Sequence, residues 1–431
     1  MQRTLKFNGW YLLGVVFALD FINMGFPYFG APVINSYMIE RIPMSRSTLG
    51  LGFTLVNLVV GLTAPLVAMH IVKFGVRRTL VSGCTLIACS SLFLATLASK
   101  PWHYLAAFGI VTGIGVGFAT IVPIATFVTR WFRRYRGRAM GIALSGSGFS
   151  GFAVSGLLDK VMHSAHGNWR IGWLVVCAAI MLSGVLAFFL IKESPESLGQ
   201  HVDGDQDDSA TSAAEQSAQG PWTVSQAYRT SSFWLIAFAG IVHTYTYFFF
   251  VAHAILYLKG SGISSGKAAL AMGFFTTSTL IGRWIGGLLM DFLSARLAYS
   301  LGLSLVIFGS YYLLIANRPD ALIPAYAAAI LYGCAHGWVF TCVATMTGNY
   351  YGRRNFPKLY GTMMLLISAC ASPAGYLGGK VYDLLGSYRP AIIANVILSV
   401  VSIVAILFAA APAQPGPVLS TANGALEERS L

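Results

Sequence analysis

Long apolar runs alternate with short polar connections along almost the whole chain. Each run has about 20 residues, the length that crosses a bilayer as a helix. Within lipid, only helices and closed barrels satisfy all of their backbone hydrogen bonds. The pattern therefore predicts twelve membrane-spanning helices, at residues 9–31, 48–70, 79–98, 103–127, 138–160, 170–191, 232–257, 265–290, 297–316, 321–347, 357–381 and 389–411.

The chain also repeats itself at an interval of about half its length. Three pairs of arginines are each 219 positions apart, and all lie in connections between apolar runs: Arg77 and Arg296, Arg134 and Arg353, and Arg170 and Arg389. One fixed offset indicates a duplicated bundle, the parallel-repeat plan of secondary transporters. We expect an all-α membrane protein built from two pseudo-symmetric six-helix bundles, residues 1–192 and 229–412.

Composition supports a membrane protein and locates the connecting segments. Hydrophobic residues make up 56% of the 431 positions and charged residues 10%, whereas about a quarter of the residues of soluble domains are charged. Residues 193–228 are rich in Gly, Ser, Gln and acidic residues, which is typical of a flexible linker. Residues 413–431 have a similar composition, and we interpret them as a cytoplasmic tail.

The net charge of +13 does not indicate a nucleic-acid partner, because the 28 Lys and Arg residues are spread over alternate connections rather than one face. More of them fall on the side of the N-terminus. This bias predicts that both termini and the linker are cytoplasmic, in a multi-pass protein of the cell inner membrane.

All six cysteines fall inside predicted spans, without a CxxC pair, so we expect packing residues rather than disulfides or a metal site. The sequence also lacks the HExxH motif of zinc hydrolases. We expect no cofactor and no enzymatic activity.

Two strongly charged residues lie deep inside predicted spans, Asp20 in the first and Arg283 in the eighth. Such a charge costs about 2.5–3.5 kcal/mol on insertion scales, so each requires a partner or a water-filled cavity. Arg283 can bind a carboxylate through its planar guanidinium. Alternatively, it is a structural residue that pairs permanently with Asp20.

Uncharged polar residues on other spans could complete a binding site. Tyr28 follows Asp20 on the first span, His243 and Tyr247 lie on the seventh, and His336 lies on the tenth. A histidine there could bind an anion or a proton, since its charge changes near neutral pH. A buried histidine bonded to a neighbouring helix is an equally common arrangement.

The segment Trp131-Phe-Arg-Arg-Tyr-Arg-Gly-Arg-Ala-Met-Gly-Ile-Ala, followed by Ser-Gly-Ser-Gly, resembles the fifth-helix signature of the major facilitator superfamily. Within it, the similarity is to the monocarboxylate and oxalate–formate exchanger branch, in which Asn8-Gly9-Trp10 also opens the first helix. Residues 287–296 resemble the loop motif that follows the second helix of each half, and residues 73–78 are a weaker copy with Val72 in place of Asp291.

The resemblance implies roles for several of these residues. It implies that Arg283 binds the substrate carboxylate and that Asp291, Arg296, Arg77 and Arg134 are gating residues. Topology alone would also explain the loop arginines.

The chain departs from the branch at two positions. Ile367 replaces a lysine that is typical of oxalate exchangers, which disfavours a dianion. Thr279 stands where animal monocarboxylate carriers have an acid, so their proton coupling cannot be carried over.

Asp20 is a substitute for the missing acid. Burial and a neighbouring arginine act in opposite directions on the proton affinity of a carboxylate, so such a group can titrate near physiological pH. We therefore expect a secondary transporter of a small organic anion, a monocarboxylate, by proton symport through Asp20 or by anion exchange. The alternative is an efflux carrier of drugs or other metabolites in which Arg283 is structural.

Overall fold

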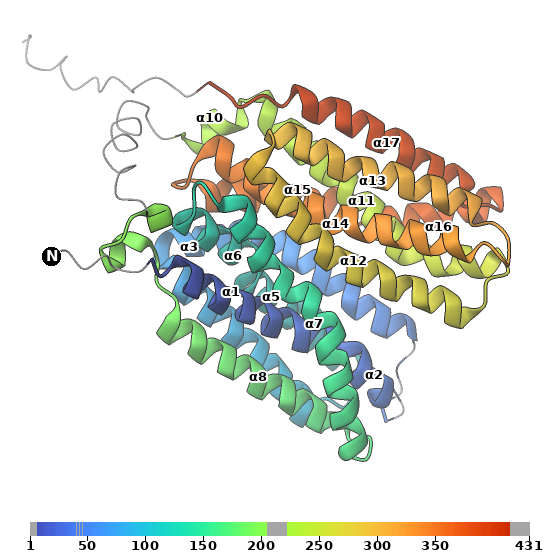
Figure 1. Cartoon of the computed structure of the whole chain (residues 1–431). Coiled ribbons are helices and arrows are strands. Elements are labelled where there is room, and N and C mark those ends of the chain that lie inside the picture. The colour runs from blue at the N-terminus through green and yellow to red at the C-terminus, as the bar shows by residue number, and fades with distance from the viewer. Residues whose placement is uncertain (1–6, 40, 43, 45, 205–221, 414–431) are drawn as a thin grey trace, which may run out of the picture.

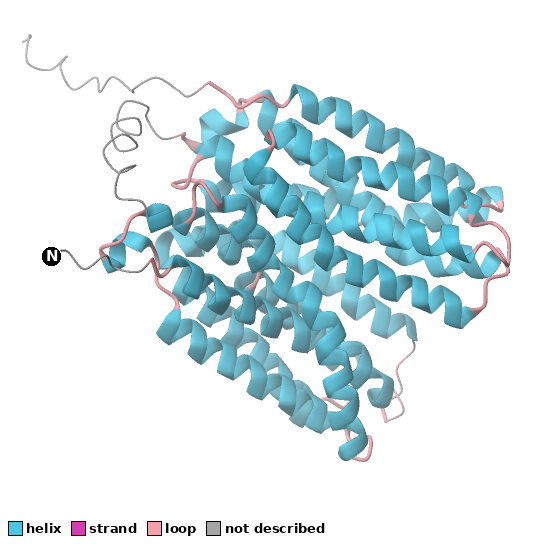
Figure 2. Cartoon of the chain, in the orientation of Figure 1, coloured by secondary structure: helices cyan, strands magenta, loops and turns pink. Residues whose placement is uncertain are grey.

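The computed structural model describes residues 7–39, 41–42, 44, 46–204 and 222–413. Throughout this part of the chain the secondary structure consists of helices joined by short loops (Figure 2). The all-α membrane architecture predicted from the sequence is therefore confirmed.

The helices of the first half follow one another in this order: α1 Gly9–Met24, the π-helical turn η1 Gly25–Phe29, α2 Ala31–Met38, α3 Arg46–Thr96, α4 Pro101–Tyr104, η2 Leu105–Thr112, α5 Gly113–Ala119, α6 Ile121–Trp131, α7 Arg136–Ser164 and α8 Trp169–Leu190. Two short 3-10 turns, η3 Pro195–Leu198 and η4 Val202–Gly204, begin the segment that joins the halves.

The helices of the second half are α10 Val224–Tyr228, α11 Ser231–Gly260, α12 Ser265–Phe292, α13 Ala295–Ile315, α14 Leu322–Tyr351, α15 Phe356–Ala371, α16 Ala374–Leu385 and α17 Arg389–Phe408. Figure 1 shows them as one bundle, coloured yellow-green to red, beside the blue-to-green bundle of the first half.

Within the described residues, nine helices are long and apolar enough to cross a membrane. One of them, Leu51–Thr96, has 46 residues and bends at Gly75, whose φ of 89° is outside the helical range, so it provides two crossings. The more polar α12 and the consecutive pair α15 and α16 complete the twelve expected crossings.

Several expected spans are interrupted rather than straight. The first passes through the π-helical turn η1 before it continues as α2. The fourth is broken at Thr120, where φ is −132° and ψ is −109°. Such breaks occur where neighbouring helices or polar groups can bind the freed backbone, and Asn23 Nδ2 does so by donating to Ala119 O at 3.0 Å.

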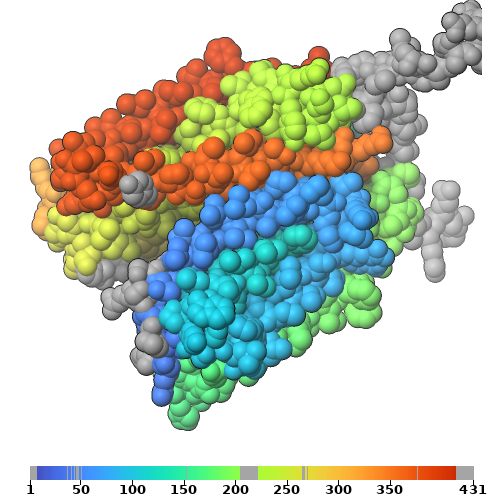
Figure 3. Space-filling view, turned by 180° about the vertical axis from the view of Figure 1, so that it is seen from behind, coloured from blue at the N-terminus to red at the C-terminus, as the bar shows by residue number. Residues whose placement is uncertain are grey.

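The two bundles meet along two seams, α7 with α12 and α3 with α15. Figure 3 shows the second seam on the molecular surface. Both seams depend on small residues, since side chains added at Gly141 or Gly361 would collide with the backbone of the facing helix. Close helix approach of this kind replaces the hydrophobic driving force that lipid does not supply.

The turns η3 and η4 lie at the same end of the molecule as the start of α1 and the end of α17 (Figure 1). We call this the linker end. At the opposite end, α7 and α12 diverge in the same view.

Candidate functional site

Arg283 lies at the middle of the α7–α12 seam because glycines allow these helices to touch. A Cβ atom at Gly141 would lie 2.6 Å from the backbone oxygen of Arg283, and one at Gly287 would lie 3.1 Å from the Cα of Gly141. The backbone of α12 is therefore in contact with α7. This contact places a cation of the second half directly against the first half.

The guanidinium of Arg283 is attached to α7 through one nitrogen. Its Nη1 donates to the backbone oxygen of Leu144 and to Ser147 Oγ, the latter at 2.6 Å. The residue is 9% exposed, and its centre lies 5.8 Å from the ring of Phe340. Its Nε is buried without a hydrogen-bond partner among the described residues. An unsatisfied donor on a buried cation is costly. A ligand that accepts a hydrogen bond from Nε would remove this cost.

Asp20 reaches the same site from α1 and is 1% exposed. Its Oδ2 accepts the backbone N–H of Ser147 at 2.6 Å. The carboxylate and the guanidinium of Arg283 are thus joined through one serine of α7. Their opposite charges attract each other across it.

Two histidines and a tyrosine of the second half form a stacked cluster. His336 Nδ1 lies 3.2 Å from His243 Nε2, and the ring of Tyr247 stacks on His336 with centroids 3.7 Å apart. The second nitrogen of His243, Nδ1, is buried without a partner within the described chain. The charge of Arg283 acts on both Tyr247 and His336, so the cluster belongs to the same site.

Tyr28 approaches from the first half. Its hydroxyl exchanges hydrogen bonds with the side-chain amide of Asn57 on α3, at 3.0 and 3.2 Å. It also interacts electrostatically with Tyr247. The structure thus gathers all the residues that the sequence singled out for substrate and proton binding, from α1, η1, α11, α12 and α14.

Sequence reasoning missed three contributors to this site: Ser147, Asn57 and Phe340. Ser147 belongs to the Ser-Gly-Ser-Gly segment of the fifth-helix signature, which was the available signal. Hydroxyl and amide residues are common in these helices, so nothing distinguished Asn57 from its neighbours.

Asp291 joins the two halves at the linker end. Its carboxylate accepts the backbone N–H groups of Gly137 at 2.9 Å and Arg138 at 3.1 Å, at the start of α7. It also forms an ion pair with Arg138 Nε at 3.1 Å. A carboxylate at a helix N-terminus is favourable because the unpaired N–H groups there carry partial positive charge.

Other contacts between the halves surround Asp291. Arg136 Nη1 donates to Asn349 Oδ1 at 2.6 Å. Arg353 Nη1 donates to the backbone oxygen of Arg130 at 2.7 Å, and its Nη2 lies 3.3 Å from Glu196. These residues were not among those that the resemblance implied.

The three arginines that the resemblance implied as gating residues make their contacts within their own halves. Arg296 Nη1 donates to the backbone oxygen of Leu407 at 2.9 Å. The guanidinium of Arg77 lies over the ring of Phe188 and that of Arg134 over the ring of Tyr135.

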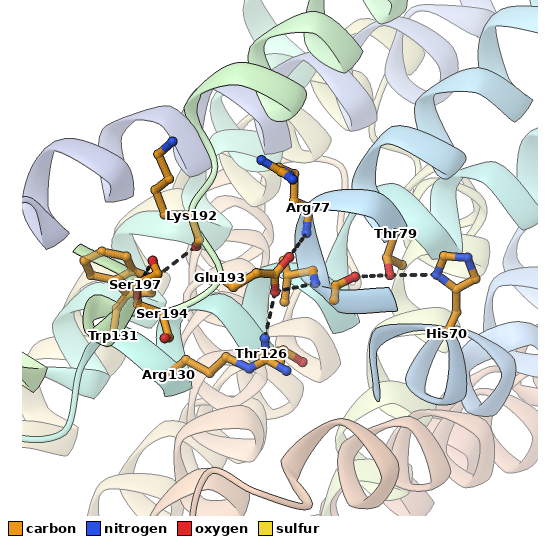
Figure 4. Close-up of polar contacts among 12 residues, drawn as sticks. His70, Arg77, Thr79, Thr126, Arg130, Trp131, Lys192, Glu193, Ser194 and Ser197 are labelled. Carbon is orange, nitrogen blue, oxygen red and sulfur yellow. Dashed lines mark hydrogen bonds and ion pairs between the residues drawn. The ribbon is translucent and has the colours of Figure 1, made fainter. Parts of the chain in front are cut away.

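Glu193 provides the acid that the first-half loop motif lacks at Val72. Its carboxylate accepts the N–H groups of Val76 at 2.8 Å and Arg77 at 2.9 Å and pairs with Arg130 at 2.9 Å (Figure 4). Glu193 lies just after α8, so this contact ties α3, α6 and α8 together inside one half. Asp291, by contrast, acts between the halves.

Comparison with known proteins agrees with this architecture. The family description "Major Facilitator Superfamily" matches residues 9–373 and 256–427. Solved structures that are similar include the Escherichia coli fucose:proton symporter, with a TM-score of 0.66 and 13% identity over 94% of this chain and 99% of that one. The proton:xylose symporter XylE has a TM-score of 0.71 and 15% identity over 92% and 94%.

Curated relatives belong to the transporter class. Monocarboxylate transporter 13 of Bos taurus is 28% identical, covering 73% of this chain and 69% of the relative. Human monocarboxylate transporter 2 is 21% identical over 88% and 81%, and the uncharacterized transporter YcxA of Bacillus subtilis is 23% identical over 90% and 91%. The chain therefore belongs to the major facilitator superfamily of membrane transporters, and within it the similarity is to monocarboxylate transporters.

Proposed function

We propose that this protein is a secondary transporter that moves a small organic anion, a monocarboxylate, by alternating access. Membership of the superfamily supports transport in general, and the position of Arg283 between the two halves supports an anionic cargo. A site at the interface of the repeats can be exposed to either side when the bundles rock against each other.

The observation that carries the proposal is that the three nitrogens of the Arg283 guanidinium differ in their hydrogen bonds. Nη1 of Arg283 is bonded to α7, whereas Nε is buried without a partner and Nη2 has no hydrogen bond to a described residue. The edge formed by Nε and Nη2 is one that binds a carboxylate through two parallel hydrogen bonds. A cargo carboxylate there would satisfy the orphaned donor.

A single cationic anchor favours a monoanion. The position at which oxalate exchangers typically have a lysine is Ile367 here, which is 5% exposed and packs against Gly240 of α11. A second carboxylate at that position would lose its hydration without gaining a cation.

Tyr28, Tyr247, His243 and His336 are proposed to form the remainder of the substrate site. They offer hydroxyl and imidazole groups from both halves to the rest of the cargo. Polar groups of this kind fix the orientation of a small ligand in a largely apolar pocket.

Asp20 is proposed to couple the anion to a proton. With the site empty, the charges of Asp20 and Arg283 cancel. A bound anion would leave one negative charge in excess, and a proton on Asp20 would restore neutrality. Both the empty and the loaded carrier would then cross the reorientation step without a net buried charge, which lipid penalises.

Asp20→Asn tests the coupling. We expect this variant to retain exchange of labelled for unlabelled anion across the membrane but to lose uptake driven by a pH gradient. Uptake that follows the gradient as in the wild type would remove Asp20 from the coupling role. If a pH gradient does not drive anion uptake by the wild type either, anion exchange is favoured over proton symport.

We also propose an orientation of the protein in the membrane and a gate on its cytoplasmic side. The excess of basic residues at the linker end supports a cytoplasmic linker and cytoplasmic termini in the cell inner membrane. Asp291 is proposed to close the cytoplasmic side, because it binds the start of α7 in the opposite half. Arg77, Arg134 and Arg296 are proposed to support this gate from within their own halves.

Uptake by proteoliposomes tests the anion anchor. We expect the purified wild type to accumulate one or more of lactate, pyruvate and formate, and Arg283→Gln to lose this uptake by about a hundredfold. Two hydrogen bonds to a charged group contribute about 1.5–3 kcal/mol each before partial replacement by the glutamine, and each 1.4 kcal/mol is a factor of ten. Arg318→Gln, in an exposed loop, is the matched control.

The rival function is an efflux carrier of drugs or other metabolites in which Arg283 only joins the halves. Its bonds to Leu144 and Ser147 are the observation that favours this rival. Equal anion uptake by the wild type and Arg283→Gln, together with transport of amphipathic compounds, would support it against our proposal.

A further inference from the structure

Three helices meet at one turn of α7, formed by Ser145, Gly146, Ser147 and Gly148. A Cβ atom at Gly146 would lie 2.8 Å from the backbone nitrogen of Phe21 on α1, so α1 is in contact with this turn. A Cβ atom at Gly148 would lie 3.7 Å from Arg283 Nη1 on α12. Ser147 lies between these two glycines and faces both contacts.

Ser147 bonds both charged residues of the central site. Its N–H donates to Asp20 at 2.6 Å, and its Oγ accepts Arg283 Nη1 at 2.6 Å while donating to the backbone oxygen of Leu144 at 3.0 Å. Leu144 O accepts the same guanidinium nitrogen. Every hydrogen bond that holds Arg283 to α7 therefore depends on the geometry of this turn.

We propose that Ser147 is a positioning residue that links the protonation of Asp20 to the release of Arg283 from α7. This inference rests on the proposed function, and it names the residue through which the proton and the anion act on each other. Ser147 was not among the site residues found from the sequence.

The linkage follows from the chemistry of the two bonds. An ionised Asp20 attracts the N–H of Ser147 strongly, because hydrogen bonds to a charged acceptor are about twice as strong as neutral ones. Protonation of Asp20 weakens this bond to Ser147. Ser147 can then move away from α1, and its Oγ, which accepts Arg283 Nη1, moves with it.

The reverse step follows from reciprocity. A cargo carboxylate on Arg283 neutralises the guanidinium and weakens its attraction for Asp20, which favours a proton there. If protonation assists anion binding, anion binding must assist protonation by the same factor. Ser147 is suited to this bridge, because its backbone N–H bonds Asp20 and its hydroxyl accepts Arg283, which keeps the two charges connected without direct contact.

Other charged and titratable groups also act on this pair. Tyr247 of α11 and His336 of α14 interact with Arg283, and Tyr28 of η1 interacts with Tyr247. They do not bond Ser147 in the described structure, so a change at Ser147 leaves their contacts in place.

The test measures anion affinity against pH for purified protein, with lactate as the probe, together with protons taken up per anion bound in weak buffer. For the wild type we expect about one proton per anion and an affinity that changes by up to about tenfold per pH unit. Ser147→Ala is expected to bind lactate at least as tightly at high pH, because Arg283 loses one of its two hydrogen bonds to α7. Its pH dependence should fall to less than half of the wild-type slope.

Ser145→Ala is the matched control. Ser145 lies in the same turn of α7 as Ser147, but its Oγ accepts the uncharged Trp284 Nε1 of α12, at 3.0 Å. It should retain the wild-type slope. Ser147→Thr should restore the slope, since it returns the hydroxyl. If Ser147→Ala cannot be purified folded, Ser147→Cys, which keeps the size of the side chain, replaces it.

Two results would overturn the inference. One is an unchanged pH slope in Ser147→Ala, and the other is a loss of lactate binding equal to that of Arg283→Gln. If the wild type binds no anion, or if Arg283→Gln binds as tightly as the wild type, it is the proposed function that fails. A failed inference is thus distinguishable from a failed function.

Discussion

Removal of the charge of Asp291 should release the two halves at the linker end. The carboxylate accepts two N–H groups from the first turn of α7 and pairs with Arg138, and its side chain is 6% exposed. Asp291→Asn keeps the shape and one acceptor oxygen but loses the charge and one backbone bond. A hydrogen bond to a charged group contributes about 1.5–3 kcal/mol, and the helix N-terminus adds about 0.3–1 kcal/mol.

The ion pair with Arg138 adds little to this total, because the arginine side chain is 34% exposed and exposed pairs contribute about 0–1 kcal/mol. We therefore expect a loss of about 2–3 kcal/mol, which corresponds to about 30- to 150-fold more of the form that is open at the linker end. Hydrogen exchange of the Gly137 and Arg138 amides measures this directly, since both are bonded to Asp291 in the closed form.

Asp159→Asn is the matched control. Asp159 is a residue of α7 itself, but it lies near the end of that helix opposite to Gly137 and Arg138, and its side chain is 56% exposed. Exchange of the Gly137 and Arg138 amides should be unchanged in this variant. If Asp291→Asn exchanges these amides within about threefold of the wild-type rate, the reasoning about the gate is wrong.

Three further predictions concern packing and the site. Gly141→Ala should lower the free energy of unfolding by about 1–3 kcal/mol, because its Cβ would lie 2.6 Å from a backbone oxygen; Gly156→Ala, which meets open space, should change the thermal midpoint little. Glu193→Gln should lower the thermal midpoint of unfolding without changing linker-end hydrogen exchange at α7, since it acts within one half. His336→Ala should weaken anion uptake at least several-fold, whereas His253→Gln, whose Nε2 contacts Gly375 O at 2.7 Å, should not; equal uptake by both would exclude His336 from the site.

The fold could be predicted because lipid leaves few choices. Apolar runs of spanning length fix the helices, and a constant offset between arginines indicates the duplication. The interruptions were not predictable in the same way. The break at Thr120 depends on which neighbouring groups bind the freed backbone, and Asn23 is remote in sequence from Ala119.

Site residues could be predicted from the sequence where their side chains are costly to bury in lipid. They could not be predicted where the residue type is common in membrane helices. Asp20 and Arg283 stand out because a buried charge requires a partner. Ser147 does not, since a serine in a membrane helix usually bonds its own backbone. Glu193 was obscured for another reason, because it replaces the missing acid at Val72 from a distant part of the chain.

The contacts of the loop arginines could not be predicted from the sequence either. The sequence places Arg77 and Arg134 in connections at the linker end, but it does not show which half their side chains contact. Both turn to aromatic rings of their own half. Arg353, the repeat partner of Arg134, contacts the opposite half instead, so equivalent positions in the two repeats serve different contacts.

The central claim is that the free edge of Arg283 binds a carboxylate. Its most direct test is a binding titration of purified protein with lactate and with lactamide, which has nearly the same shape but no negative charge. We predict that the wild type binds lactate at least tenfold more tightly than lactamide and that Arg283→Gln loses this preference. Equal binding of the two compounds by the wild type, or a preference that survives in Arg283→Gln, would contradict the account.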